Sequence, residues 1–280
     1  MSFGTCARKL HDHSLTVRVF GVLFMVGFRR WSSYRLAAVA GAVANTVFGL
    51  VRSAVIIAAI TAHGGMLGGY DEFTGVTYVW IGQALLGPIY FNTWTELSDR
   101  IRTGDVAVDL VRPFDLQTQL LATDLGRAAY QFLPRGLPPL IVGALVTGLA
   151  LPTVPVPYLF GLVSAILAVA VSFAARWLVN LVAFWLLDLR GPMALYSVAL
   201  NVLGGLVVPV YWFPSWLARL AAWTPFPAML QQPVDVLMGR VSGWAAVETL
   251  AGQAAWFAGL MIAGQLVFRL GARKLVVQGG

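Results

Sequence analysis

Six long runs of apolar residues, separated by shorter polar stretches, set the pattern of the chain. The runs cover residues 37–62, 74–95, 129–151, 157–187, 191–212 and 246–268. A helix needs about 20 apolar residues to cross a hydrocarbon core about 30 Å thick. The pattern therefore predicts six transmembrane helices in a single all-α membrane domain over residues 1–280. The fourth run exceeds one crossing, and the third is interrupted near its start by Pro134, Arg135, Pro138 and Pro139.

A shorter apolar stretch precedes the first run. Residues 16–28 are too few to cross, contain Arg18 and end at Arg29 and Arg30. A signal peptide also has a basic start and a short apolar core, but a small-residue cleavage site should follow it, and none does here. The pattern favours a helix in the membrane interface, within a cytoplasmic N-terminal segment over residues 1–36.

The composition agrees with a membrane protein. The chain is 59% hydrophobic and 11% charged, whereas soluble domains contain about 25% charged residues. The net charge of +7 could suggest nucleic-acid binding, but no basic patch with interleaved aromatic residues occurs outside the apolar runs. The chain has one cysteine and three histidines, which excludes an intramolecular disulfide and a cysteine-based metal site, and we predict no metal site.

The basic residues predict the orientation, because cytoplasmic loops carry an excess of Lys and Arg. With the N-terminus inside, fourteen of the nineteen Lys and Arg residues fall in cytoplasmic segments. Two, Arg219 and Arg240, fall in exterior segments, and three lie within the runs. This asymmetry, together with the even number of runs, predicts that both termini are cytoplasmic.

The predicted cytoplasmic loop over residues 96–127 is rich in acidic side chains. It holds half of the twelve acidic residues of the protein. Asp105, Asp109 and Arg112 are spaced i, i+4 and i+7, which places them on one face of a helix, and Pro113 ends that helix. Two interpretations stay open: a solvated loop helix, or a docking element for a cytoplasmic partner.

The predicted exterior loop over residues 213–245 is unusually apolar and aromatic. Prolines interrupt it before it can cross a membrane, so we expect short helices at the outer interface, where Trp and Tyr are enriched. It is either an aromatic belt with no further role or a lid over a translocation path. The lid interpretation rests on Phe213, Pro214, Trp216, Pro225 and Phe226.

Three arginines lie within the predicted spans. Arg52 lies deepest, and an ionisable group at such depth is costly and often functional. It either extends its guanidinium outward, pairs with a carboxylate or serves the function directly. We expect Arg135 and Arg176, nearer the inner leaflet, to extend toward the membrane surface.

Motifs for enzymatic chemistry are absent from the sequence. Both lysines follow an arginine, whereas a phosphate-binding loop needs a lysine after a glycine. The sequence also lacks an HExxH zinc motif and a GxSxG nucleophile motif. We therefore predict that this chain is not an enzyme and has no cofactor of its own.

Several short motifs resemble those of a known family in their order along the chain. They are Ser33-Tyr34-Arg35, Ile101 to Asp105, Leu110 to Pro113, Phe184-Trp185, Phe213 to Trp216, Pro225-Phe226, Pro233 and Gly239. With the six runs, they make nearly the whole chain similar to an ABC permease of the type-two exporter superfamily. The most similar subgroup is the bacterial one described as ABC-2 family transporter proteins.

The resemblance implies an ATP-driven exporter in a bacterial cell membrane. It implies an ABC ATPase partner in two copies, which binds ATP and Mg²⁺, and a second permease that is either related or identical to this chain. It implies a coupling helix over residues 101–113, with Arg102, Gly104, Asp105, Asp109, Arg112 and Pro113. It also implies a translocation path near the second and fifth spans, for which the candidates are Tyr90, Asn92, Tyr196 and Asn201. The cargo is expected to be amphipathic.

Two other function classes stay open at this point. The first is a self-contained channel or ion-coupled carrier, but carriers usually keep an ionisable residue at mid-membrane. No Asp or Glu lies centrally in a predicted span, apart from Glu248 near one end of the last. The second is a structural scaffold, which would need no coupling helix.

Overall fold

The computed structural model of the chain describes residues 3–89, 94–111, 114–186 and 188–274, with side chains from residue 17 onward. Within these ranges the protein is helical, with no strand and one isolated bridge between Leu67 and Tyr70. This confirms the predicted all-helical class. Among the described residues, three helical segments are long and apolar enough to cross a membrane: α2 (Arg35–Ala62), α8 with its continuation η1 (Val156–Phe184), and α13 (Gly243–Ala272).

Two of these helices keep most of their apolar surface on the outside of the protein. Only 22% of the most apolar stretch of α2 is buried, and only 11% of that of α13. On α2, Val39, Val43 and Phe48 are all exposed. Because apolar surface of this extent is unfavourable in water, these faces require lipid or another apolar partner.

The other three predicted spans correspond to shorter or interrupted helices. They are α3 (Glu72–Ile89), the pair α6 (Leu116–Arg135) and α7 (Leu137–Val146), and α9 (Arg190–Leu203). The 14 residues of α9 give about 21 Å of helix, less than a hydrocarbon core. Whether these segments cross the membrane therefore stays a prediction.

The start of α6 differs from the predicted loop over residues 96–127. Asp115 caps the helix by accepting a 2.9 Å hydrogen bond from the backbone N–H of Thr118. This N-cap satisfies a backbone donor that would otherwise lack a partner. The last part of the predicted loop is thus the first half of a long helix.

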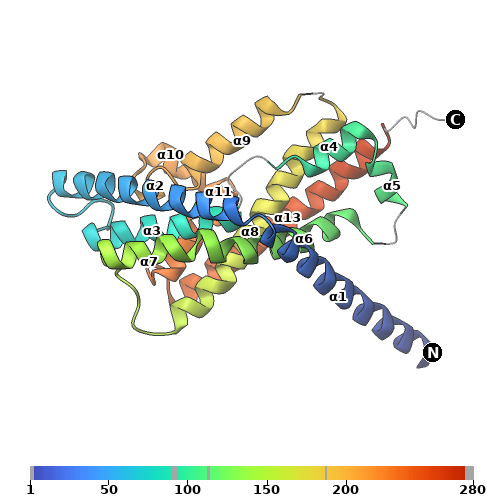
Figure 1. Cartoon of the computed structure of the whole chain (residues 1–280), viewed down its shortest axis with the longest axis horizontal. Coiled ribbons are helices and arrows are strands. Elements are labelled where there is room, and N and C mark those ends of the chain that lie inside the picture. Colours follow the sequence, from blue (N-terminus) through green and yellow to red (C-terminus); the bar gives the residue numbers. More distant parts are fainter. Residues whose placement is uncertain (1–2, 90–93, 112–113, 187, 275–280) are drawn as a thin grey trace.

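The N-terminal helix α1 (Phe3–Ser32) is longer than the stretch predicted from residues 16–28. One face of its described part packs on α6, and the rest of the helix extends away from the body of the protein (Figure 1). Val17, Val22 and Met25 are exposed on its outer side, and Arg29 and Arg30 lie in its last turn. This amphipathic surface fits the predicted interfacial position.

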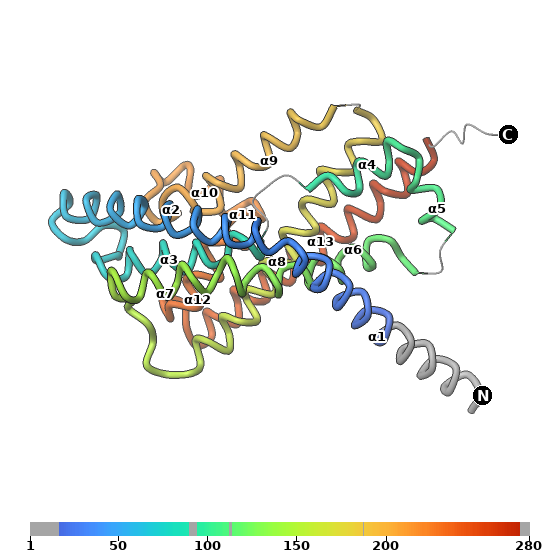
Figure 2. The backbone as a smooth tube through the Cα atoms, viewed as in Figure 1, coloured from blue at the N-terminus to red at the C-terminus, as the bar shows by residue number. Residues whose placement is uncertain are grey.

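Helix α3 lies inside the bundle and contributes to one of its two apolar clusters, while α8 contributes to both. It packs against α2, α6, α7 and α8, and most of its side chains are buried. One cluster surrounds Tyr78, Ile89 and Met229, and the other surrounds Trp94 and Trp177. Figure 2 traces the short elements that follow α9: η2 (Val210–Trp212), α10 (Ser215–Ala222), α11 (Phe226–Met229) and α12 (Gln231–Leu237).

Candidate functional site

A helical hairpin after α3 carries most of the residues predicted to dock a partner. It consists of α4 (Glu96–Thr103) and α5 (Val106–Leu110). Gly104 ends α4 with a φ of 83°, a left-handed conformation that glycine adopts without steric cost. The side of the hairpin that faces the bundle is buried, because Leu97, Ile101 and Val106 lie in the cluster that contains Trp177.

The two aspartates of this hairpin lie in different environments. Asp109 is buried and accepts a 2.8 Å hydrogen bond from Arg100, while Asp105 is exposed and accepts one from Thr103 Oγ1 at 2.7 Å. Asp105 is the N-cap of α5 and Asp109 lies within the helix, so of these two aspartates only Asp105 is offered to a partner. Arg112 and Pro113 lie outside the described residues.

The outer surface of α5 is apolar. Val108, Leu110 and Val111 are 60%, 46% and 82% exposed, although a solvated loop helix should present polar side chains there. Exposed apolar side chains beside charged ones are typical of a protein–protein contact. Arg102, exposed at the end of α4, and Asp105 supply the charges.

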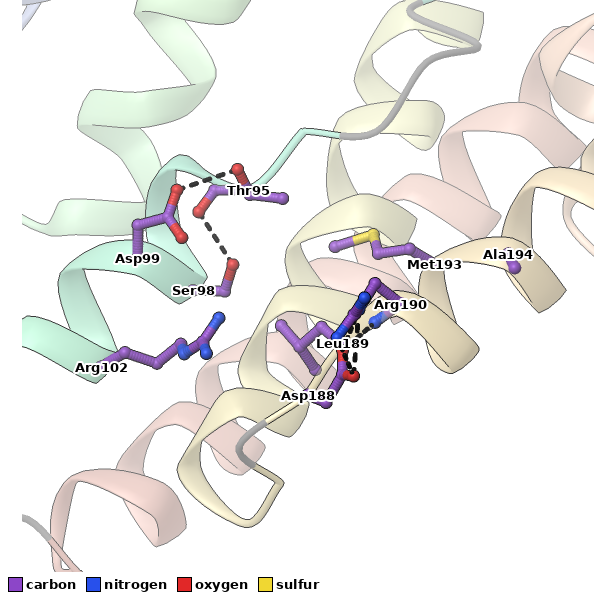
Figure 3. A pocket seen from close by; sticks show the side chains of 9 residues that line it. All are labelled: Thr95, Ser98, Asp99, Arg102, Asp188, Leu189, Arg190, Met193 and Ala194. Atoms are coloured by element: carbon purple, nitrogen blue, oxygen red, sulfur yellow. Dashed lines mark hydrogen bonds and ion pairs between the residues drawn. The ribbon is translucent and has the colours of Figure 1, made fainter.

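A pocket of about 560 Å³ lies between α4 and the start of α9. Figure 3 shows Thr95, Ser98, Asp99 and Arg102 on the α4 side, facing Asp188, Leu189, Arg190, Met193 and Ala194 on the other. Hydrogen bonds from Arg190 lower the pKa of the Asp188 carboxyl. The pocket therefore combines charges of both signs with the apolar side chains of Leu189, Met193 and Ala194.

A second pocket, of about 530 Å³, lies on an adjacent face of α4, and Thr95 and Asp99 line both pockets. It is lined by α1, α4 and α6, and Arg30 on its wall forms a 3.3 Å ion pair with Glu96. The exposed side of α4 therefore faces two neighbouring pockets, while Leu97 and Ile101 are buried.

The predicted path residues are only partly within the structure. Tyr196 is buried and packs on Phe226 with 6.0 Å between ring centroids, which brings a predicted path residue onto a predicted lid residue. Asn201 donates to Ser197 of its own helix at 2.7 Å. Tyr90 and Asn92 lie outside the described residues.

The predicted lid segment divides into an outer and an inner part. Pro214 and Trp216, at the start of α10, are exposed, whereas Phe213 and Pro225 are half-buried. The following helices α11 and α12 turn inward, and Ala228, Met229 and Val234 are almost completely buried. Short inward helices of this kind are tolerated at membrane depth when protein surrounds them.

A polar cluster between the α2–α3 loop and α12 was not predicted from the sequence. Asp235 accepts hydrogen bonds from Gln231, Tyr211 and Tyr70 at 2.9–3.3 Å. Arg240 lies over the Tyr70 ring at 3.9 Å, donates to the Gly69 carbonyl at 2.7 Å and pairs with Asp235 at 3.7 Å. These contacts fasten the α2–α3 loop to the segment that leads into α13.

This cluster predicts a pH-dependent stability. Burial raises the pKa of Asp235 to about 6, although its hydrogen bonds and Arg240 oppose the shift. The folded state binds the Asp235 proton more tightly than the unfolded chain does, so protonation of Asp235 stabilises the folded protein at low pH. This contribution is lost as pH rises through about 6. We expect unfolding in detergent to require about 1 kcal/mol more at pH 5 than at pH 7.

Asp235→Asn is the control for that measurement. It keeps the shape of the side chain and removes its titration, so the variant should lose about 1 kcal/mol of the pH dependence. A variant with the same pH dependence as the natural chain would assign the effect to other groups.

A buried ion cluster joins α6 and α8. Asp124 accepts 2.7 Å hydrogen bonds from Arg127 and from Arg176, and the three side chains are at most 6% exposed. The prediction that Arg176 reaches the membrane surface is therefore wrong, because a carboxylate from another helix holds its guanidinium inside. The sequence contained a sign of this cluster, because Gln117, Asp124, Arg127 and Gln131 recur at helical spacing and so share one face of α6. All four are buried.

The other two arginines of the predicted spans, Arg52 and Arg135, donate to backbone carbonyls. Arg52 donates to the Leu206 carbonyl and forms no ion pair with any side chain in the described ranges. Arg135 donates to the Ala37 carbonyl at 3.2 Å. Arg52 therefore ties α2 to the segment after α9, and the carboxylate pairing considered for it is not found within those ranges.

One comparison with known proteins assigns the chain to a family. A family model described as "ABC-2 family transporter protein" matches residues 48–279, which include every helix after α2 and more than half of α2 itself. No curated protein matches the chain.

Proposed function

Because the chain belongs to the ABC-2 family of transporter proteins, we propose that it is the membrane-spanning subunit of an ATP-driven exporter. The ATPase is a separate subunit that carries ATP and Mg²⁺, present in two copies and docked on the hairpin of α4 and α5. In this proposal the six spans are α2, α3, α6 with α7, α8, α9 and α13. Both termini are in the cytoplasm of a bacterial cell.

The hairpin is the observation that carries the proposal. Its outer side presents the exposed side chains Val108, Leu110 and Val111 together with the exposed charges Arg102 and Asp105, while its inner side is buried among α6, α8 and α13. A partner bound to the outer side would therefore act directly on the packed helices. Export then proceeds by exchange between inward-open and outward-open states, which the bound nucleotide populates differently.

The pocket between α4 and α9 supports a cytoplasmic entry for the cargo. It places Asp99, Arg102 and Arg190 around Leu189 and Met193. A cargo with an apolar body and a charged group would satisfy both kinds of lining. A second permease, either a related chain or another copy of this one, would cover the exposed side chains of α9, such as Leu195 and Val198.

Co-purification tests the docking site. Val108→Asp places a charge in the centre of the proposed contact, where burying it unpaired should cost about 2 kcal/mol and weaken ATPase binding about 30-fold. The measurement is the amount of ATPase recovered with the tagged permease after detergent extraction.

Val154→Asp is the matched control, since Val154 is 55% exposed in the loop before α8, far from the hairpin in sequence. It should leave the recovered ATPase unchanged. Full recovery with Val108→Asp would move the docking site elsewhere. Nucleotide hydrolysis or ion-driven transport by the purified chain alone would contradict the proposed function and favour a self-contained carrier.

A further inference from the structure

The C-terminal end of α3 and the N-terminal end of α4 are both bound by side chains of other helices. The last carbonyls of a helix and its first N–H groups have no partners within the helix. Here α6 and α8 provide those partners through Asp124, Arg127, Ser172, Arg176 and Asn180, a set that we call the inner clamp.

At α3, two residues of the clamp bind three consecutive carbonyls. Arg127 donates to the Gly87 carbonyl at 2.9 Å and to the Pro88 carbonyl at 2.7 Å. Ser172 donates to the Ile89 carbonyl at 2.7 Å. A cation at a helix C-terminus is also favoured by the helix dipole, so α6 and α8 hold this end by both hydrogen bonds and charge.

At α4, a single side chain of α8 binds the start of the helix. Asn180 accepts a 3.1 Å hydrogen bond from the Ser98 N–H and donates to the Trp94 carbonyl at 2.8 Å. Thr95, the N-cap residue of α4, makes no capping bond with its own side chain. Asn180 therefore takes over the capping of α4 from a different helix.

The two halves of the clamp are connected to each other. Arg176 pairs with Asp124 at 2.7 Å, donates to Ser172 at 3.3 Å and lies over the Trp94 ring at 5.6 Å. Its own carbonyl accepts from Asn180 at 2.8 Å. All five clamp side chains are at most 6% exposed, so burial strengthens these bonds.

We propose that the inner clamp makes α3 and α4 move as one unit, so that a displacement of α4 by the ATPase reaches α3 through the side chains of α6 and α8. This inference rests on the proposed function, since it names the residues that carry the motion from the docking site. The clamp residues are positioning residues: they touch neither nucleotide nor cargo.

Electron spin resonance distance measurements test the proposal. Spin labels go on Phe73→Cys, near the start of α3, and Asp99→Cys on α4, both exposed, with Cys6→Ser removing the native thiol. The distance is measured in the permease–ATPase complex without nucleotide and after trapping with ATP and vanadate. In the natural clamp, we expect a narrow distribution that is the same in both states.

Two clamp variants should change this result. Asn180→Leu removes both bonds to α4, and Ser172→Ala removes the bond to Ile89 with little change in volume. With either, the trapped state should show a shifted or broadened distance. Asn45→Leu is the matched control, because the Asn45 amide donates to the Gln83 carbonyl of α3 at 3.4 Å and to the Arg135 carbonyl of α6 at 3.2 Å, on helices other than α4; its distribution should stay narrow.

Two results would overturn the proposal. One is a distance that already changes on trapping with the natural clamp, because α4 would then move without α3. The other is a distribution that stays narrow and unchanged in both clamp variants. If no ATPase accompanies the chain, the proposed function fails, and the clamp is then tested in the isolated permease, where Asn180→Leu alone should broaden the distance.

Discussion

Replacing Asp124 with leucine is expected to destabilise the protein by about 3–5 kcal/mol, because it leaves two buried guanidinium groups without their carboxylate. Arg127 keeps its bonds to two carbonyls, but Arg176 loses its 2.7 Å ion pair. For a chain of this size we expect the unfolding temperature in detergent to fall by roughly 10 °C. Thermal unfolding of the purified variant, followed by size-exclusion chromatography, measures this.

The double variant Asp124→Leu/Arg176→Met separates charge from packing. It removes the Arg176 cation together with the carboxylate, and such replacements of buried ion pairs by apolar residues are often nearly neutral. We expect it to recover a large part of the lost stability, a coupling that a double-mutant cycle measures. If Asp124→Leu alone unfolds within about 1 kcal/mol of the natural chain, the ion cluster is not structural.

The apolar pattern of the sequence predicted the positions of the helices better than it predicted which face of each helix packs on protein. The apolar runs at residues 37–62 and 246–268 became α2 and α13 because such helices need only length and apolar composition. The same criterion cannot tell which face meets protein. Helix α3 is as apolar as its neighbours but is enclosed by them, and this enclosure depends on residues far away in the sequence.

Charges were harder to place because their partners are not local. Arg176 looked like a side chain that reaches the membrane surface, yet Asp124, 52 residues earlier, holds it inside. The same holds for Asp235 and Tyr70, which are 165 residues apart. Helical spacing indicates which charges share a face of α6, but no local rule identifies the helix that this face meets.

The docking residues were predicted by a mixture of spacing and resemblance. Gly104 ends α4 as a left-handed cap, a role that its residue type favours. The i, i+4 spacing placed Asp105 and Asp109 in the same short helical segment, but it could not show that Asp109 turns inward to Arg100. The coupling helix over residues 101–113 that the resemblance implied is divided at Gly104, because a glycine inside a predicted helix is a possible end of that helix.

The crossing of α1 and α6 leads to the second large effect. Gly27 of α1 lies against the backbone of Thr123 in α6, Gly126 of α6 lies against the backbone of α1, and a methyl group on Gly126 would overlap the Phe24 carbonyl oxygen. Backbone atoms cannot turn aside as a flexible side chain can. Gly126→Ala is therefore expected to separate the helices, at a cost on the order of 3 kcal/mol.

Thiol cross-linking across this contact measures the separation. Phe28 and Tyr130 pack edge to face with 5.5 Å between ring centroids, so a short bifunctional thiol reagent should join cysteines at these positions in a Cys6→Ser chain. Gly126→Ala should abolish the cross-link. Gly21→Ala is the matched control, because a methyl group there meets no atom within 4 Å and alanine favours the helix. An undiminished cross-link in Gly126→Ala would mean that α1 is held by other contacts, and that α6 does not depend on this close approach to keep its position beside α1.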